Sequence, residues 1–583
     1  MPARNSITLR RVAWVLPAVV LGVLALPLLT NRTFGNDWPD HLWLVWQQAQ
    51  SIAQLGRPSY FLQAHQGVYE PFFAFYGGTF YAVTGAVANL IGGHPTVAYC
   101  AAIIFGFTGA YLGSTWISYQ VGLRGWRAQI PGLLYVTAPY FITNPFGRGD
   151  VPEAMACAAI PLVAASGLAV LRAERIRPLP AAALVLSATW FTGCHNITTL
   201  WGSTFLLATA VLLALAFGWR RVSGRRILCV LGFAALGVAV NAWFLFPAVA
   251  YAGRTAISQG GFAGFAFDSW GSVFSPLRDE PELLTSGKLN TQMPVLAFAW
   301  ALIVLVVAWR RLPPQRRRFA VGMLAIVVAV LALILTDMSI VPRPWSHIQF
   351  PYRAETYVSL GVCALALCAL AAVPFIASHL LRRVALGGFA LIAIVSFGQA
   401  IEQQWSQPTQ LASRSLVYQP EGLYPPSWYA GFDYADVSLP AIPFGKLVTV
   451  PGSSIVGGDG ESFIPIPTHG HADINTVTFT SPGPHPVATN VYGGPYLVKV
   501  TGAKVIGRSP SNELVIEPTA PKGKQVKVTF STAHSAPVVL GIITTLAAIA
   551  VCLLLAAWAL WRAWRAGQLR LPRRRRRALS GSA

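Results

Sequence analysis

The sequence predicts a polytopic α-helical membrane protein of about twelve transmembrane helices, with a small extracytoplasmic β-rich domain before the last helix. Of the 583 residues, 54% are hydrophobic and only 11% are charged, whereas about a quarter of the residues of a soluble domain carry charge. Apolar runs of about 18 residues or more, which suffice to cross a bilayer, recur from Ala13 to Ala400 and from Pro537 to Leu560. The stretch 401–535, by contrast, is polar and rich in turn residues.

The basic residues give the expected orientation. The formal net charge is +22, but these residues gather in short connections between apolar runs, which is typical of cytoplasmic loops rather than of a nucleic-acid surface. The expected cytoplasmic clusters are Arg10/Arg11, Arg124/Arg127, Arg172/Arg175/Arg177, Arg220/Arg221/Arg225/Arg226, Arg310 to Arg318, Arg382/Arg383 and the tail from Arg562. The connections poor in Lys and Arg are then extracytoplasmic, namely 31–70, 144–153, the turn at His195, 251–292, 337–355 and 401–535.

The expected number of membrane crossings depends on which side of the membrane the two chain ends lie. Both ends of the chain are basic and are expected in the cytoplasm, so the number of spans is even. Thirteen apolar candidates are present, and the weakest is 71–93, which is interrupted by glycines and aromatic residues. A crossing there would also misplace Arg124 and Arg127. We therefore expect 71–93 to be re-entrant or interfacial and twelve helices to cross, with thirteen or fourteen as the alternative.

The polar stretch divides the chain into parts. Residues 1–400 form the expected transmembrane domain, 401–535 the β-rich domain, 536–561 the last transmembrane helix and 562–583 a basic cytoplasmic tail. Within 401–535, alternating apolar and polar residues bounded by turn residues predict short strands. The expected strands are Lys446 to Val450, Thr476 to Phe479, Tyr496 to Val500, Glu513 to Ile516 and Gln525 to Phe530.

The first candidate site follows the first span. Asp37, Asp40 and His41 stand in the sequence Asn36-Asp37-Trp38-Pro39-Asp40-His41. If Pro39 lies in the first turn of a helix, Asp37 caps that helix, and Asp40 and His41 face one side. The structural alternative is a simple helix cap with two hydrated neighbours. Three ionisable groups at a membrane surface favour function, because carboxylates there can act as a general base or bind a divalent cation.

Two further extracytoplasmic segments carry charge at the start of a span. Arg148 lies close to Asp150 and Glu153, and such groups are costly at a span boundary unless they pair. An ion pair is thus one interpretation, and a phosphate held by Arg148 beside a hydroxyl or metal held by Glu153 is the other. The segment from Arg343 to Glu355 combines aromatic residues with Arg353. It is either an interfacial belt with a snorkelling arginine or a site that binds phosphate and sugar.

The candidate substrate-binding residues come from these segments and from one histidine. His195 interrupts an apolar stretch, where a lone histidine is more often structural than functional. The full set of candidates for substrate binding is Glu153, His195, Trp345, His347 and Glu355.

Four short motifs carry a family resemblance. They are Asp37-x-x-x-His41, Gly56-Arg57-Pro58, Arg148-Gly149-Asp150-x-x-Glu153 and Pro351-Tyr352-Arg353. Over residues 10–400 the chain resembles the bacterial membrane proteins often labelled 6-pyruvoyl-tetrahydropterin synthase-related. Such proteins look like glycosyltransferases of the GT-C fold, which use a polyprenyl-phosphate sugar donor and carry an acidic motif in the first outward loop.

The resemblance implies a role for each site residue. Asp37 would be the catalytic base, with Asp40 and His41 assisting, and Arg148 and Arg353 would neutralise the donor's phosphate. No cofactor is certain, and a divalent cation such as Mg or Mn is left open, with Asp37 and Asp40 as its ligands. The separation of these two acids by Trp38-Pro39 departs from the adjacent or alternate acids of many GT-C motifs.

The expected function is that of an inverting glycosyltransferase in a bacterial plasma membrane. It would move a sugar from a polyprenyl phosphate to an envelope glycan or lipid on the extracytoplasmic face, where 401–535 would hold the acceptor. The alternatives are a transporter or flippase of a lipid-linked glycan and a non-enzymatic envelope scaffold. A flippase would show ionisable groups near the midplane, and no P-loop supports transport driven by ATP. We expect membrane lipids as partners and no nucleic acid.

Overall fold

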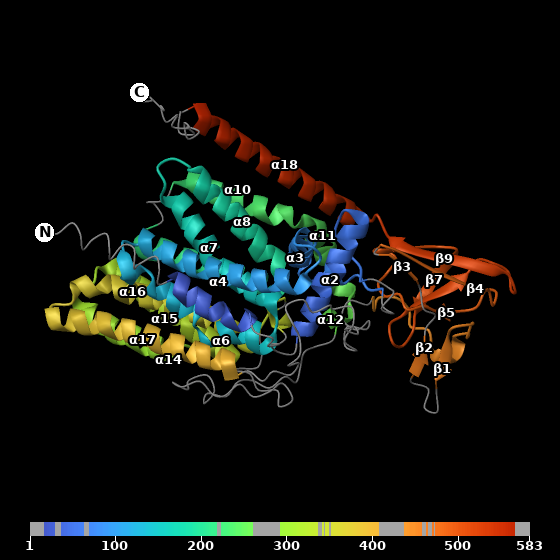
Figure 1. The fold of residues 1–583 in the computed structure, drawn as a ribbon, viewed down its shortest axis with the longest axis horizontal. Helices are drawn as coiled ribbons and strands as arrows, with labels where there is room; N and C mark the ends of the chain where they lie inside the picture. Colours follow the sequence, from blue (N-terminus) through green and yellow to red (C-terminus); the bar gives the residue numbers. More distant parts are fainter. Residues whose placement is uncertain are drawn as a thin grey trace, which may run out of the picture.

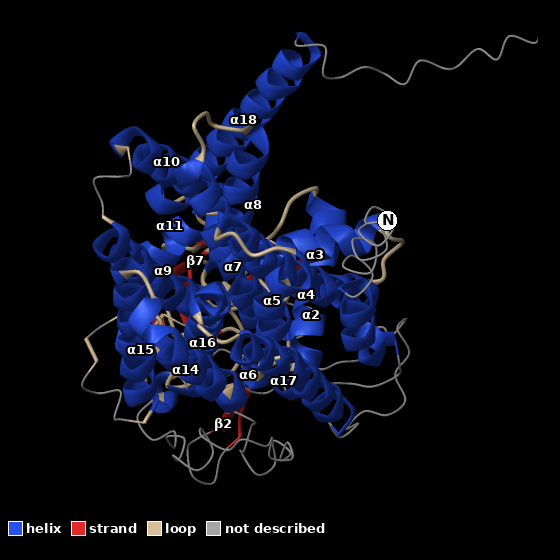
Figure 2. Cartoon of the chain, turned by 90° about the vertical axis from the view of Figure 1, so that its left-hand side faces the viewer, coloured by secondary structure: helices blue, strands red, loops and turns tan. Residues whose placement is uncertain are grey.

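The computed structural model describes residues 17–29, 37–62, 69–218, 223–259, 292–335, 341–342, 344–348, 351–406, 436–456, 462–464, 469–471 and 473–565. Most of these residues are helical, and the long helices lie roughly side by side (Figure 1). The strands gather at one end of them, near the labels α2 (Trp38–Leu55) and α12 (Ala256–Gln259). Seen along the bundle, the helices pack around one another with the strands behind them (Figure 2).

Seven helices of the described residues are long and apolar enough to cross a membrane. They are α4 (Pro95–Gln120), α7 (Val151–Arg172), α9 (Asn196–Phe217), α15 (Pro314–Ile334), α16 (Glu355–Ala372) with its flanking turns, α17 (His379–Ser406) and α18 (Ala536–Arg565). An eighth is formed if α10 (Gly224–Val240) and α11 (Ala242–Tyr251), bent by 81° at their junction, count as one span. The chain is therefore a multi-span helical protein, and the count of twelve stays a prediction.

Other apolar segments of the described residues are too short to be counted among these spans. Pro17–Leu29, α8 (Pro178–Cys194) and α14 (Val295–Ala308) have between 13 and 17 residues. A fourth segment is broken into α5 (Ile130–Val136), α6 (Pro139–Ile142) and the π-helix η4 (Thr143–Arg148). Helices of this length reach about 20 to 26 Å at 1.5 Å per residue, which is slightly less than the bilayer core.

Helices α4 and α7 lie side by side and run in the same direction. A Cβ on Gly106 would meet Met155, and one on Gly113 would meet the backbone of Leu162. Residues later in α4 thus face residues later in α7. Because parallel neighbours need a return path, the chain between them must pass back along the bundle, and it does so through α5, α6 and η4.

The segment predicted not to cross, 71–93, contains the turn η2 (Phe72–Ala74) and helix α3 (Gly78–Leu90). At 13 residues, α3 is about 20 Å long and too short to cross alone. Its N-terminal neighbour Gly77 lies against the carbonyl of Cys194. The last turn of α3 is hydrogen-bonded to helix α2 (Trp38–Leu55), because the Asn89 side-chain amide donates to the Ala49 carbonyl at 2.8 Å.

The strands form two larger antiparallel sheets and one hairpin. One sheet has the order β3-β4-β9-β6, the second has the order β5-β8-β7, and β1 pairs with β2. The bounds are β1 Ser454–Val456, β2 Ser462–Ile464, β3 His469–His471, β4 Ile474–Thr480, β5 Val487–Ala488, β6 Val498–Thr501, β7 Ala503–Arg508, β8 Leu514–Pro518 and β9 Gln525–Thr532. In the central pair, Val477 of β4 stands opposite Val528 of β9, and both are buried.

Four of the five predicted strands are confirmed as β4, β6, β8 and β9. The prediction for Lys446 to Val450 is wrong. Lys446 ends a 3-10 turn, Phe444–Lys446, and no strand follows it before Ser454 among the described residues. Leu447 and Val450 are buried, so the alternation there reflects packing without a partner strand.

The strand region, from β1 to β9, contacts the segment that follows α2. Tyr69 and Val491 form a parallel bridge, and the Ser59 hydroxyl donates to Asp473 Oδ1 at 2.5 Å. Arg57 Nη2 lies 2.5 Å from Asp473 Oδ2. α17 extends six residues past the predicted boundary at 400, and α18 extends four past 561. Residues 407–435 and 566–583 lie outside the described part of the chain.

Candidate active site

A compact charge cluster joins three segments that are far apart in the sequence. We use this name for Asp37, Arg148, Asp150, Glu153 and Arg353. The Arg148 guanidinium lies at its centre, with Nη1 2.8 Å from Glu153 Oε2 and Nη2 3.2 Å from Asp150 Oδ2. The same Nη2 lies 3.8 Å from Asp37 Oδ2. The predicted pairing of Arg148 with Asp150 or Glu153 is thus confirmed for both.

Local backbone geometry positions this arginine. The π-helix η4 ends at Arg148, and Gly149 follows with φ +81°, in the left-handed region that favours glycine. A Cβ on Gly149 would stand 2.5 Å from the Trp38 backbone nitrogen. The chain reversal then lets Asp150 cap α7, since its Oδ1 accepts from the Glu153 amide at 3.0 Å.

A second arginine enters the cluster from the start of α16. Arg353 Nε lies 3.1 Å from Glu153 Oε2, and Arg353 Nη2 lies 3.7 Å from Asp150 Oδ2. Tyr140 adds a hydroxyl that donates to Glu153 Oε1 at 2.8 Å and accepts from Arg148 Nη1 at 3.2 Å. Two buried carboxylates thus share two buried guanidinium groups, which satisfies the requirement that buried charges be paired.

Asp37 differs from the other two carboxylates of the cluster. Its side chain is 26% exposed, whereas those of Asp150 and Glu153 are 2% and 1% exposed. It occupies the cap position of α2 but makes no capping hydrogen bond, so the predicted capping role is wrong. Burial raises the pKa of Asp37 to about 6, even though Arg148 opposes this shift. Asp37 is therefore an accessible carboxylate with the basicity of a group that accepts protons near neutral pH.

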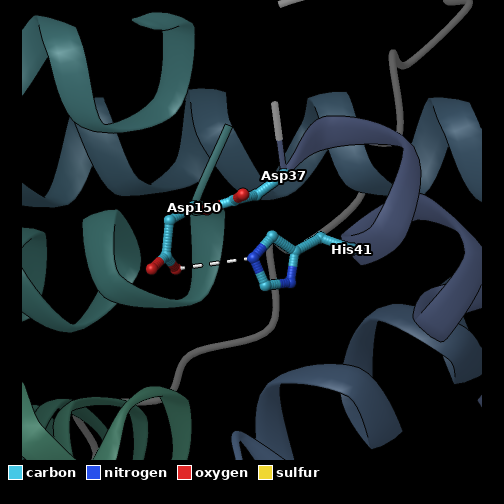
Figure 3. Close-up of side chains that lie close together, drawn as sticks. All are labelled: Asp37, His41 and Asp150. Atoms are coloured by element: carbon cyan, nitrogen blue, oxygen red, sulfur yellow. Dashed lines mark ion pairs between the residues drawn. The ribbon is translucent and has the colours of Figure 1, made fainter. Parts of the chain in front are cut away.

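His41 lies between the charge cluster and Tyr81. Its Nε2 is 3.7 Å from Asp150 Oδ1, and its Nδ1 is 2.5 Å from the Tyr81 hydroxyl. Asp37, His41 and Asp150 converge in Figure 3, in which the dashed line joins the imidazole to Asp150. Burial lowers the pKa of His41 to about 4, so the imidazole is neutral at physiological pH.

His195 approaches the same cluster from the turn between α8 and α9. Its ring packs edge-on against Tyr76, with centroids 5.3 Å apart, and the Tyr76 hydroxyl donates to Asp150 Oδ1 at 3.3 Å. Burial lowers the pKa of His195 to about 4. This histidine is therefore a buried, neutral neighbour of the carboxylates.

Asp40 is placed differently from Asp37. It lies in the first turn of α2, is buried, and no hydrogen bond or ion pair reaches its carboxyl group among the described residues. Burial, and secondarily Asp37, raises the pKa of Asp40 to about 8. Among the described residues, the Asp40 carboxyl group thus interacts with the charge of Asp37 but forms no ion pair with Arg148 or Arg353.

The remaining predicted residues are Trp345, Glu355 and His347. The Trp345 indole donates to the Thr204 hydroxyl at 2.9 Å, which places Trp345 beside α9. Glu355 is buried in the first turn of α16, two residues after Arg353. The side chain of His347 lies outside the described part of the structure.

Sequence reasoning missed three groups that surround the cluster, namely the hydroxyls of Tyr76, Tyr81 and Tyr140. Tyr76 and Tyr81 fall in 71–93, where the aromatic content is equally typical of a membrane interface. A tyrosine in an apolar run, such as Tyr140, carries no signal that separates a buried hydrogen bond from ordinary packing.

The donor set fits a divalent cation poorly. Among the residues that the structure describes, two groups of candidate ligands have their atoms within 4.8 Å of one another, Asp37/His41/Asp150 and Asp150/Glu153/His195. Neither group contains the predicted ligand Asp40. Both use Asp150, whose Oδ2 already faces the guanidinium groups of Arg148 and Arg353. A cation would have to share these oxygens with two fixed positive charges, which is unfavourable at such distances.

Comparison with known proteins adds the following findings. The sequence matches no family model, and no match to a curated protein was found. The structural neighbours are mycobacterial arabinosyltransferases. Arabinofuranosyltransferase AftD from Mycobacteria is 14% identical, with a TM-score of 0.42, over 70% of this chain and 27% of AftD. Arabinosyltransferase EmbB from Mycobacterium smegmatis is 13% identical, with a TM-score of 0.35, over 89% of this chain and 62% of EmbB. The chain thus spans about a quarter of the length of AftD.

Proposed function

We propose that the chain is an inverting glycosyltransferase of the GT-C type, in the group labelled 6-pyruvoyl-tetrahydropterin synthase-related. It transfers a sugar from a polyprenyl phosphate to an envelope glycan or lipid on the extracytoplasmic face of a bacterial plasma membrane. The observation that carries this proposal is the position of Asp37. A partly exposed carboxylate at the start of α2 stands against a buried arginine.

Asp37 acts as the general base. It accepts the proton of the acceptor hydroxyl while that oxygen bonds to the anomeric carbon of the donor sugar. The bond from this carbon to the phosphate oxygen breaks on the opposite side, and its electron pair leaves with the polyprenyl phosphate. Attack opposite the leaving group inverts the configuration at the anomeric carbon.

The charges of the cluster suit this transfer. As the reaction proceeds, Asp37 loses one negative charge and the departing phosphate gains one. Arg148, 3.8 Å from Asp37, stabilises the carboxylate before the transfer, and Arg148 with Arg353 attracts the phosphate afterwards. Fixed arginines in a site that excludes water can lower such a barrier by several kcal/mol.

Other residues keep this arrangement in place. Glu153 and Asp150 hold the two guanidinium groups, and neutral His41 lies between Asp150 and the Tyr81 hydroxyl, to which it is hydrogen-bonded. The strand region is joined to the segment after α2 through Asp473. We propose that this region holds the acceptor glycan.

The proposal is tested by comparing Asp37→Asn with Asp40→Asn. Purified variants in detergent are given a panel of polyprenyl-phosphate sugars, with arabinose, mannose and galactose donors. Asp37→Asn should lower transfer by about 100-fold or more, because the base is lost. Asp40→Asn, the matched control from the same helical turn, should lower it by less than about 10-fold, because Asp40 is not paired with the arginines. Wild-type transfer by Asp37→Asn would overturn the proposal and favour a scaffold or a flippase.

A further inference from the structure

The hydrogen bonds of His195 fix which of its ring nitrogens carries the proton. His195 caps α9, and its Nδ1 accepts from the Thr198 backbone amide at 3.2 Å. A backbone amide can only donate, so Nδ1 presents a lone pair. In the neutral ring the proton therefore lies on Nε2, which is a hydrogen-bond donor.

This donor has no partner among the described residues. The Nε2 atom is buried, and the His195 side chain as a whole is 1% exposed. A ring nitrogen of His195 and one carboxylate oxygen from each of Asp150 and Glu153 lie within 4.8 Å of one another. Nε2 is the ring nitrogen that remains available to them, because Nδ1 is engaged by Thr198. Leaving such a buried donor unsatisfied is unfavourable, so a further group is expected between the ring and the acids.

The hydrogen-bonding properties of Nε2 on one side and of the two carboxylates on the other determine which group can lie between them. It must accept a hydrogen bond from Nε2 and donate one to a carboxylate, and a hydroxyl does both. A divalent cation does not fit, because it needs a lone pair on Nε2. A phosphate offers only acceptors to the two acids, and an ammonium group offers only donors to the histidine.

We propose that His195, with Asp150 and Glu153, binds one hydroxyl group of the transferred sugar. This inference rests on the proposed function and adds a residue that determines sugar specificity. Asp150 also belongs to the other group of atoms within 4.8 Å of one another, with Asp37 and His41, so the hydroxyl and the base border the same carboxylate. The edge-on contact with Tyr76 fixes the plane of the His195 ring.

Two substitutions separate the cap of α9 from the Nε2 donor. In His195→Asn, the amide oxygen can replace Nδ1 as the acceptor from Thr198, since Asn is a good helix cap, but the Nε2 donor is lost. In His195→Gln, the longer side chain can place an amide donor near the position of Nε2, but the cap is lost. If His195 serves only as the helix cap, the Gln variant should be the more impaired of the two. If His195 binds a hydroxyl, the Asn variant should be the more impaired.

The measurement is the ratio of kcat/KM for a polyprenyl-phosphate sugar to that for each of its monodeoxy analogues. Wild type should prefer the complete sugar by about 10- to 100-fold at one hydroxyl position, as expected for one buried hydrogen-bonded group. His195→Asn should reduce this preference to less than about 3-fold and leave the other positions unchanged, while His195→Gln should retain most of it.

Two results would overturn the inference, and they are distinguishable. If His195→Asn keeps the wild-type preference at every position, the gap holds only a water molecule and the specificity role fails, while the proposed function stands. If the wild type transfers no sugar from any polyprenyl phosphate, the proposed function fails together with the inference.

Discussion

Gly149 lies so close to Trp38 that a Cβ on the glycine would stand 2.5 Å from the tryptophan backbone nitrogen. The Asp37 amide, one residue before Trp38, donates to the Arg148 carbonyl at 2.8 Å. The first outward loop and the turn before α7 therefore meet backbone to backbone. The separation of Asp37 from Arg148 depends on this contact.

The first prediction concerns Gly149→Ala. The substitution should lower transfer by at least about 10-fold and lower the melting temperature, because α2 must move away from Arg148. Gly93→Ala is the matched control. Gly93 has φ +83°, and a Cβ there would meet no atom of the described residues within 4 Å, so it carries the same backbone strain of about 1 to 2 kcal/mol without the collision. Equal effects of the two variants on transfer would contradict the importance of this contact.

The second prediction concerns Arg148→Met. Removing the guanidinium leaves Asp150 and Glu153 with Arg353 alone, and loss of one partner from a buried network typically costs about 3 to 5 kcal/mol. Thermal unfolding of the purified protein in detergent should show a clear fall in the melting temperature. Arg175→Met, in the exposed connection between α7 and α8, should leave it unchanged. An unaltered melting temperature for Arg148→Met would show that the network does not support the fold.

The third prediction concerns metal removal. Because guanidinium groups already face the Asp150 and Glu153 oxygens, we expect EDTA to change the transfer rate by less than about 2-fold, and we expect no gain from added Mg²⁺ or Mn²⁺. The assay compares chelated, dialysed and metal-supplemented protein. A loss of transfer that Mn²⁺ restores would contradict this and would make Asp37, His41 and Asp150 the first candidates for ligands.

The fourth prediction concerns topology. A reporter after Arg318 should read cytoplasmic and one near Gly457 extracytoplasmic, because the basic connections set the orientation. A cysteine at His94, just before α4, should react with an impermeant maleimide from outside, because Tyr99 at the start of α4 donates to the Gly149 carbonyl beside the cluster. A cysteine at Arg175 should react only from the cytoplasm. Reaction of the His94 position from the cytoplasm alone would show that 71–93 crosses.

Much of the candidate site was accessible from the sequence for one physical reason. Charges are costly at the start of a span unless they pair, and Asp37, Arg148 and Arg353 all fall on connections that the arginine pattern places on one face. Their convergence follows from that common placement. The sequence could not show which carboxylate stays exposed, because that depends on Trp38 packing against Tyr99 and on the turn at Gly149.

The errors have a common cause as well. The strand predicted at Lys446 to Val450 had suitable alternation, but it forms no ladder with a second strand among the described residues, and pairing is decided by residues distant in the sequence. The sugar-binding role of Trp345 stays a prediction, and its indole N–H donates to the Thr204 hydroxyl. Tyr140 was missed because its hydroxyl acquires a role only when Glu153 and Arg148 are brought to it.

The central claim, that Asp37 is the general base, is tested most directly by the pH dependence of kcat/KM for sugar transfer. A base acts when unprotonated, and burial raises the pKa of Asp37 to about 6. The wild-type rate should therefore fall about tenfold per pH unit below pH 6 and level off above it, and Asp40→Asn should keep this inflection. The residual rate of Asp37→Asn should show no inflection near pH 6. A flat wild-type profile between pH 5 and 8, or an unchanged inflection in Asp37→Asn, would contradict the account.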